Sequence, residues 1–120
     1  SILDAALDVN VATGVVKIPE FIPEENLTAP QGATHVSFRS GFSSINFDTN
    51  ATSTVYSPKV KLPIDLTMAD VVLTPPSVPD TGVGQKWMVV LLIEFYQEVD
   101  GVSYPLSNGA FNALSVLSME

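Results

Sequence analysis

The sequence contains few residues whose type and spacing could perform catalysis. His35 is the only histidine, so a nucleophile–base–acid triad would have to use it. Glu94 and Glu98 fall on one face of a strand, but their spacing separates them by roughly 13 Å, too far for either mechanism of glycoside hydrolysis. No G-x-S-x-G segment is present. We therefore predict that the protein is not an enzyme, and a hydrolase with carboxylates gathered from distant strands is the least favoured alternative.

Metal and cofactor motifs are also missing. The chain has no cysteine, which rules out disulfides, thiol catalysis and thiolate metal ligands. The best candidates for a calcium loop, residues 48–50 and the segment around Asp80, contain common turn-forming residues and lack the D-x-[DN]-x-[DN]-G pattern. We expect neither a metal nor a cofactor.

Aromatic side chains on the surface could bind a sugar by stacking. Tyr96 and Tyr104 lie on opposite sides of Asp100-Gly101, a pair typical of a two-residue type I′ hairpin turn. Such a turn places Tyr96 near Pro105, so the two tyrosines form either a stacking patch or ordinary cross-strand packing. Carbohydrate binding through Tyr96 and Tyr104 is therefore the alternative function.

The charge balance limits the classes of partner. Thirteen carboxylates against five Lys and Arg give a net charge of -8, which repels phosphate backbones and argues against nucleic-acid binding. Of the cations only Lys59 and Lys61 lie close together, on one side of a predicted strand. No apolar run approaches the ~20 residues that span a bilayer, so we expect no membrane insertion. The compartment is not fixed by these data, and a cell-surface or secreted location is favoured.

The elements that must position these residues are short strands. Nine prolines and seven glycines separate apolar stretches that alternate with a period of two, and no long stretch has a helical period. One helical turn is predicted at residues 23–26. Strands are predicted at residues 6–11, 15–18, 33–42, 53–57, 59–66, 69–76, 86–99, 102–106 and 110–119. A separate short segment at residues 43–47 carries Ile45 and Phe47 before a turn, a further turn is predicted at Asn108-Gly109, and the last strand is expected to be covered on both sides.

The segment at residues 86–99, KWMVVLLIEFYQEV, is the most apolar and indicates a long inner strand. Its first face carries alternating large apolar residues from Trp87 to Phe95. Its second face begins with Met88, Val90 and Leu92 and is predicted to end in solvent at Glu94 and Glu98. The apolar start of the second face needs a cover, which an N-terminal strand, a loop or a neighbouring subunit could provide.

These patterns predict one domain over residues 1–120. The fold class is all-β, a two-sheet antiparallel β-sandwich of immunoglobulin-like architecture with about 7–9 strands. Charged residues make up only 15% of the chain, against about 25% in ordinary soluble domains. This deficit indicates that part of the surface is covered by another domain or subunit, or is a flat surface of Ser, Thr and Asn.

Two segments resemble an uncharacterised protein family of Bacteroidota. They are GATHVSFRSG at residues 32–41 and LLIEFYQEVDGVSYPLSNGAFNALSV at residues 91–116. In that family a long strand ending in a phrase like EFYQEVNG is followed by Y-x-L-x-N-G-x-[FY]-N-A-L. The resemblance covers roughly residues 30–120 and implies the C-terminal domain of a longer chain. The family has no assigned function, so the resemblance implies no active site.

The function predicted from the sequence is a non-enzymatic structural or protein–protein interaction module. It would self-associate or pack in a larger assembly, and its interaction face would be Met88, Val90 and Leu92. The expected partner is a protein, either a second copy or a neighbouring domain. A glycan is the alternative ligand.

Overall fold

Nine strands and one short helix make up the part of the chain that the structure, a computed structural model, describes: residues 2–107 and 112–119. Along the chain the elements are β1 (Asp8–Asn10), β2 (Val15–Phe21), α1 (Pro23–Asn26), β3 (His35–Asn46), β4 (Thr52–Tyr56), β5 (Val60–Pro63), β6 (Ala69–Leu73), β7 (Gln85–Val99), β8 (Val102–Pro105) and β9 (Asn112–Met119).

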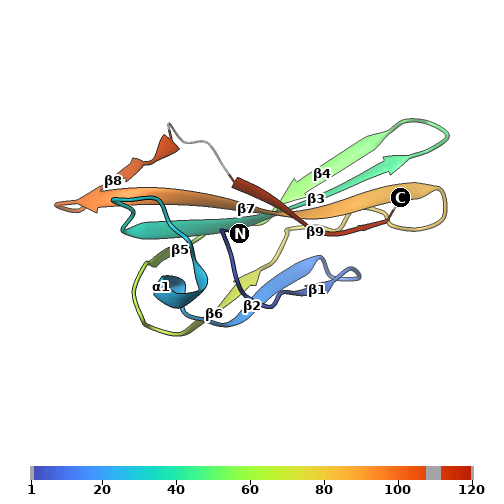
Figure 1. Ribbon diagram of the computed structural model, residues 1–120. Coiled ribbons are helices and arrows are strands. Elements are labelled where there is room, and N and C mark those ends of the chain that lie inside the picture. The colour runs from blue at the N-terminus through green and yellow to red at the C-terminus, as the bar shows by residue number, and fades with distance from the viewer. Residues whose placement is uncertain (1, 108–111, 120) are drawn as a thin grey trace.

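The strands form two antiparallel sheets that pack face to face (Figure 1). The small sheet has the order β1-β2-β6. The large sheet has the order β4-β3-β7-β8, with β5 also beside β3 and β9 also beside β7. The centre of the large sheet is the pair β3 and β7, which stay in register from His35 opposite Tyr96 to Asn46 opposite Gln85. The structure thus confirms the predicted all-β, two-sheet antiparallel β-sandwich.

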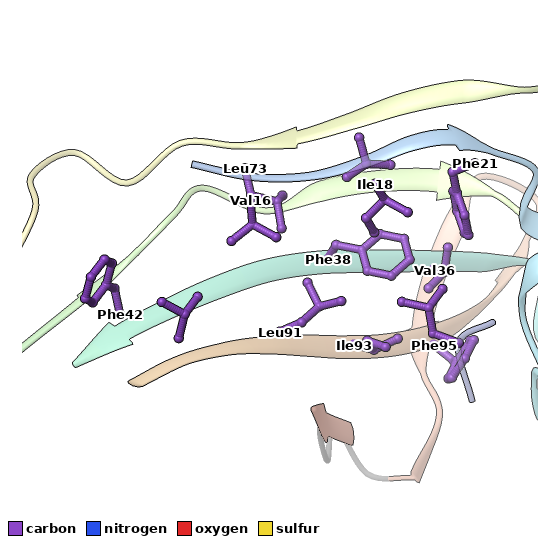
Figure 2. Close-up of a cluster of buried hydrophobic side chains, with 13 residues drawn as sticks. Val16, Ile18, Phe21, Val36, Phe38, Phe42, Leu73, Leu91, Ile93 and Phe95 are labelled. Carbon is purple, nitrogen blue, oxygen red and sulfur yellow. The ribbon is translucent and has the colours of Figure 1, made fainter. Parts of the chain in front are cut away.

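The core lies between the two sheets and is filled by alternate residues of four strands. Figure 2 shows these side chains pointing toward one another from β2 and β6 on one side and from β3 and β7 on the other. Phe21 and Phe38 meet edge to face with ring centroids 5.3 Å apart. Val89, Leu91 and Ile93 of β7 are completely buried, because the middle of one face of this long strand lies within the sandwich.

The turn predicted after β7 is confirmed. Asp100 and Gly101 both have positive φ, 51° and 78°, as a type I′ turn requires. The turn places Tyr96 opposite Pro105, in the expected register. The helical turn at Pro23–Asn26 is also confirmed.

Two details of the strand prediction were wrong. β3 runs unbroken from His35 to Asn46, where the sequence indicated two segments. β9 was expected to be covered on both sides. It is an edge strand that pairs only with β7 among the described strands, and Ala113, Ser115 and Leu117 are exposed. The turn predicted at Asn108-Gly109 lies outside the described residues.

Candidate functional site: the outer face of the large sheet

The large sheet has one face in the core and one that points away from the small sheet, which we call the outer face. Because side chains alternate along a strand, the residues between Val89, Leu91, Ile93 and Phe95 of β7 point outward. Residues directly opposite one another in the ladder share a face. The register therefore sets these outward residues beside the odd-numbered residues of β3, from His35 to Ile45.

One half of this face is apolar and accessible; we call it the apolar half, formed by Ile45, Tyr56, Met88, Val90 and Leu92. Met88 is 43% exposed and Val90 and Leu92 are half-buried. Apart from Tyr56, the strands on either side contribute small residues, Thr from β4 and Ala and Ser from β9. These short side chains leave Met88 exposed and Val90 and Leu92 partly accessible within the described chain.

Gly41 gives the apolar half its flat centre. A Cβ at this position would lie 3.1 Å from Val90 Cγ2 and 3.3 Å from Tyr56 Cε1. The missing side chain therefore lets Tyr56 of β4 and Val90 of β7 approach each other over the backbone of β3. Arg39 lies at the margin with its guanidinium carbon 4.9 Å from the Tyr56 ring centroid, and its Nε donates to the Ser57 carbonyl at 3.3 Å.

A shallow cavity of about 280 Å³ opens at the end of the apolar half. Trp87 and Met88 supply apolar surface, and Lys86 is the one charged residue among the described residues of the lining. The other lining residues are Ser43, Ser44, Ile45, Thr52, Thr54 and Ser118. The hollow is thus a largely uncharged extension of the same accessible surface.

The other half of the outer face is a closed polar network, which we call the polar half. Glu94 is only 5% exposed and Tyr96 8% exposed. Lys59 Nζ donates to Glu94 Oε1 at 3.2 Å, and the Tyr96 hydroxyl donates to the same oxygen. Ser37 Oγ lies 2.9 Å from the Tyr96 hydroxyl. A buried carboxylate is stable only when it is paired in this way.

A second tier of contacts continues the polar half toward the β7–β8 turn. Lys61 Nζ donates to Ser103 Oγ at 2.7 Å and lies 3.5 Å from Glu98 Oε2. The same ammonium lies 4.6 Å from the centroid of the Tyr96 ring. Lys59 and Lys61 thus face the same side, as predicted, and their long side chains cover this half of the sheet.

Burial and ion pairing shift two pKa values in this network. The pKa of Tyr96 is raised above its ordinary value of 10.0, first because the phenol is buried and then because it donates to Glu94. The pKa of Lys59 is also raised, mainly because the ammonium donates a hydrogen bond to Glu94. Both shifts favour the protonated forms that donate to the carboxylate.

The structure corrects the prediction for the polar end of β7. Glu94 was expected to face solvent, but it is buried because Lys59 and Tyr96 converge on it. The polar half is therefore covered, whereas Met88 of the apolar half is exposed. This reverses the predicted order of covered and solvated residues along the second face of β7.

The predicted stacking patch is not formed by Tyr96 and Tyr104. Tyr104 is 53% exposed but lies opposite Gln97, so its side chain points to the other face of the sheet from Tyr96. Tyr96 is buried and is held by Glu94 and Ser37. The two rings cannot stack on one ligand, and the glycan alternative loses the pair on which it was based.

The residues considered for catalysis and metal binding have structural contacts. His35 Nδ1 lies 2.8 Å from Thr34 Oγ1 and 3.5 Å from Glu98 Oε2. Asp80 accepts a hydrogen bond from the Gly82 amide, a common turn contact. Among the described residues no group of three or more His, Asp or Glu is placed to hold a metal ion.

Charge is distributed unevenly over the two sheets. Four of the five cations, Arg39, Lys59, Lys61 and Lys86, point to the outer face of the large sheet, as register, alternation and ion pairs show. Among the described residues, the strands of this face contribute two carboxylates, Glu94 and Glu98. The face therefore carries a net +2 in a chain whose net charge is -8.

The sequence did not connect Arg39, Gly41 or Tyr56 with the interaction face, and it did not predict the pairing of Lys59 with Glu94. A weak signal for the last was present: Lys59 and Lys61 are spaced by two residues, as strand neighbours on one face must be. The partner strand could not be read from local pattern, because Lys59 and Glu94 are 35 positions apart.

The comparisons with known proteins do not assign a family. No protein-family model matches the chain, and neither a curated protein nor a solved structure is significantly similar to it. The resemblance to a Bacteroidota family remains a prediction.

In the described residues no helix is long and apolar enough to cross a membrane. The class of protein that the fold defines is a two-sheet β-sandwich with one accessible, partly apolar sheet face.

Proposed function

We propose that this protein is a non-enzymatic structural or protein–protein interaction module, which self-associates or packs in a larger assembly through the apolar half of its outer face. The observation that supports the proposal is the two-sided central strand β7. Its inner residues are shielded by the small sheet, but on its outer side Met88 is exposed and Val90 and Leu92 are only half-buried in the described chain.

Physical considerations favour a protein partner for this face. Soluble proteins rarely expose contiguous apolar surface without an interaction role. The apolar half combines aliphatic residues with Tyr56 and the adjacent Arg39, and aromatic, Met and Arg residues are enriched at protein interfaces. The flat surface over Gly41 suits another flat surface better than a small ligand.

The test is the effect of a charge in the apolar half. We expect the wild-type protein to associate at micromolar concentrations and Met88→Lys to weaken that association about tenfold, because burying an unpaired ammonium is costly. Val102→Lys is the matched control, since Val102 is similarly exposed, at 50%, on the β7–β8 hairpin away from this face. Sedimentation velocity measures the mass, and thermal unfolding confirms that both variants fold.

Two results would contradict the proposal. One is a clean monomer across micromolar concentrations, together with a full-length chain in which no adjoining domain contacts Met88. The other is association that Met88→Lys and Val102→Lys weaken equally, since the contact would then not depend on the apolar half.

A further inference from the structure

We propose that the outer face of the large sheet receives the small sheet of a second copy, so that copies stack head to tail. This inference depends on the proposed function, because it names the partner of the same face. The observation behind it is that the two outer surfaces of the sandwich carry opposite charges. These surfaces point in opposite directions from a common core (Figure 1).

The outer face of the large sheet carries a net positive charge. Four cations and two carboxylates give it +2, which leaves eleven carboxylates and one lysine, net -10, to the rest of the sequence. In the described chain Arg39 and Lys86 form no ion pair, and both contact aromatic rings, Tyr56 and Phe47. Their charges flank the apolar half and are available to an acidic partner.

The small sheet carries a net negative charge on its outer surface. Its core-facing residues include Val16, Ile18, Val71 and Leu73, so alternate residues point outward. Asp8, Lys17 and Val72 lie side by side across the three strands. Two more exposed carboxylates, Asp70 and Glu20, adjoin them, and Asp70 accepts a hydrogen bond from the Glu20 amide at 2.7 Å. This surface therefore carries a net charge of -2, which matches the +2 of the other face.

The two surfaces are also complementary in their apolar residues. Val72 is 45% exposed on β6, at the edge of the small sheet's outer surface and beside Lys17 of β2. Stacked sheets approach to about 10 Å, which brings such a side chain into contact with residues like Met88 and Leu92. Specific interfaces commonly combine such apolar contacts with polar and charged ones.

The alternative self-contact, outer face against outer face, is disfavoured by the same charges. A two-fold arrangement would oppose two faces of +2, with Arg39 and Lys86 of each copy against those of the other. Head-to-tail stacking instead pairs unlike surfaces of successive copies. Such an interface is heterologous, and without closure into a ring it produces a growing stack.

The experiment uses two variants, each blocked on one surface. Arg39→Glu with Lys86→Glu reverses the charge of the outer face, and Asp8→Lys with Glu20→Lys reverses that of the small sheet. Each variant alone is expected to be monomeric, because one surface of every contact is repulsive. A mixture is expected to associate again into alternating stacks, since the wild-type outer face of one variant meets the wild-type small sheet of the other and the two reversed surfaces also carry opposite charges. Sedimentation velocity and native mass spectrometry measure both.

Salt dependence of the wild-type protein is an independent measurement that needs no variant. The charge pairs proposed here are screened within about 8 Å at physiological ionic strength, so association should weaken by about tenfold or more as salt is raised. A purely apolar contact would be unaffected or strengthened. Lys86→Glu lowers the net charge by two. The double variant Thr67→Glu with Ser77→Glu lowers it by the same amount and is the control. Only Lys86→Glu should weaken association.

The outcomes separate this inference from the proposed function. If the small-sheet variant associates like the wild type while Met88→Lys does not, the stacking is overturned but the outer face remains an interaction surface. A mixture that stays monomeric, or a wild-type assembly that salt strengthens, also overturns the stacking. If neither Met88→Lys nor either charge variant changes association, both proposals fail.

Discussion

Replacing Tyr96 with Phe removes one hydroxyl from the buried network and leaves the ring in place. That hydroxyl donates to Glu94 and lies 2.9 Å from Ser37 Oγ. A hydrogen bond to a charged group contributes about 1.5–3 kcal/mol, and its loss leaves Glu94 with Lys59 as the remaining side-chain donor. We expect Tyr96→Phe to lower the free energy of unfolding by about 2 kcal/mol, or roughly 6–12 °C in Tm for a domain of this size.

Urea unfolding at neutral pH measures this difference, with Tyr104→Phe as the matched control. Tyr104 is exposed, so removal of its hydroxyl should change the free energy of unfolding by less than about 0.5 kcal/mol. The reasoning is refuted if the two variants are equally stable. That result would mean that Glu94 is held by Lys59 alone and that the phenol contributes only its ring.

The same variant should change the response to alkaline pH. Because the folded-state pKa of Tyr96 is raised above 10.0, the unfolded chain loses the phenolic proton first. The contribution to stability is therefore complete below about pH 10 and is lost as pH rises through the raised pKa. The raised pKa of Lys59 acts in the same direction. We expect the wild-type protein to lose stability more steeply above pH 10 than Tyr96→Phe, and equal slopes would contradict this assignment.

Further variants test the core and one turn. Phe38→Ala should cost about 3–5 kcal/mol in urea unfolding, because Phe38 is fully buried and packs edge to face on Phe21; a loss below about 1 kcal/mol would contradict that packing. Gly14→Ala should cost more than Gly84→Ala, since both have positive φ but only at Gly14 would a Cβ meet Pro75 Cγ, at 2.7 Å. Equal losses of Tm would show that backbone strain alone matters.

Much of the fold could be predicted from local pattern. The alternation of β7 between Trp87 and Phe95 defines its core face, because a pleated strand in a sandwich must place every second residue inside. Asp100-Gly101 predicts the next turn, because few residue pairs tolerate two successive positive φ values. These signals depend on neighbours in the sequence and need no knowledge of the partner strands.

The candidate site was predicted less completely, because its properties arise from contacts between distant strands. Met88, Val90 and Leu92 were identified by their apolar character on the second face of β7. The burial of Glu94 depends on Lys59, which arrives from the segment before β5, and on the hydroxyl of Tyr96. A glutamate in a strand has no local feature that distinguishes a paired buried carboxylate from a solvated one.

The contrast between the two halves of the outer face follows from a change of neighbour along β3. Its first half pairs with β5 and its second half with β4, and Ser57 bridges the change by bonding to the backbone of Ser40. Lys59 and Lys61 beside the first half are long enough to reach across the sheet and close over Glu94 and Tyr96.

Beside the second half, β4 and β9 contribute Ser, Thr and Ala to the outer face, and these side chains are too short to shield Met88 or Leu92. Shielding of the outer face is thus set by the side-chain length of the flanking strands and not by the polarity of β7 itself. Within the described residues the apolar half stays accessible to water, so its burial requires a partner, either an adjoining domain or a second molecule, and the cations at its margin favour an acidic one.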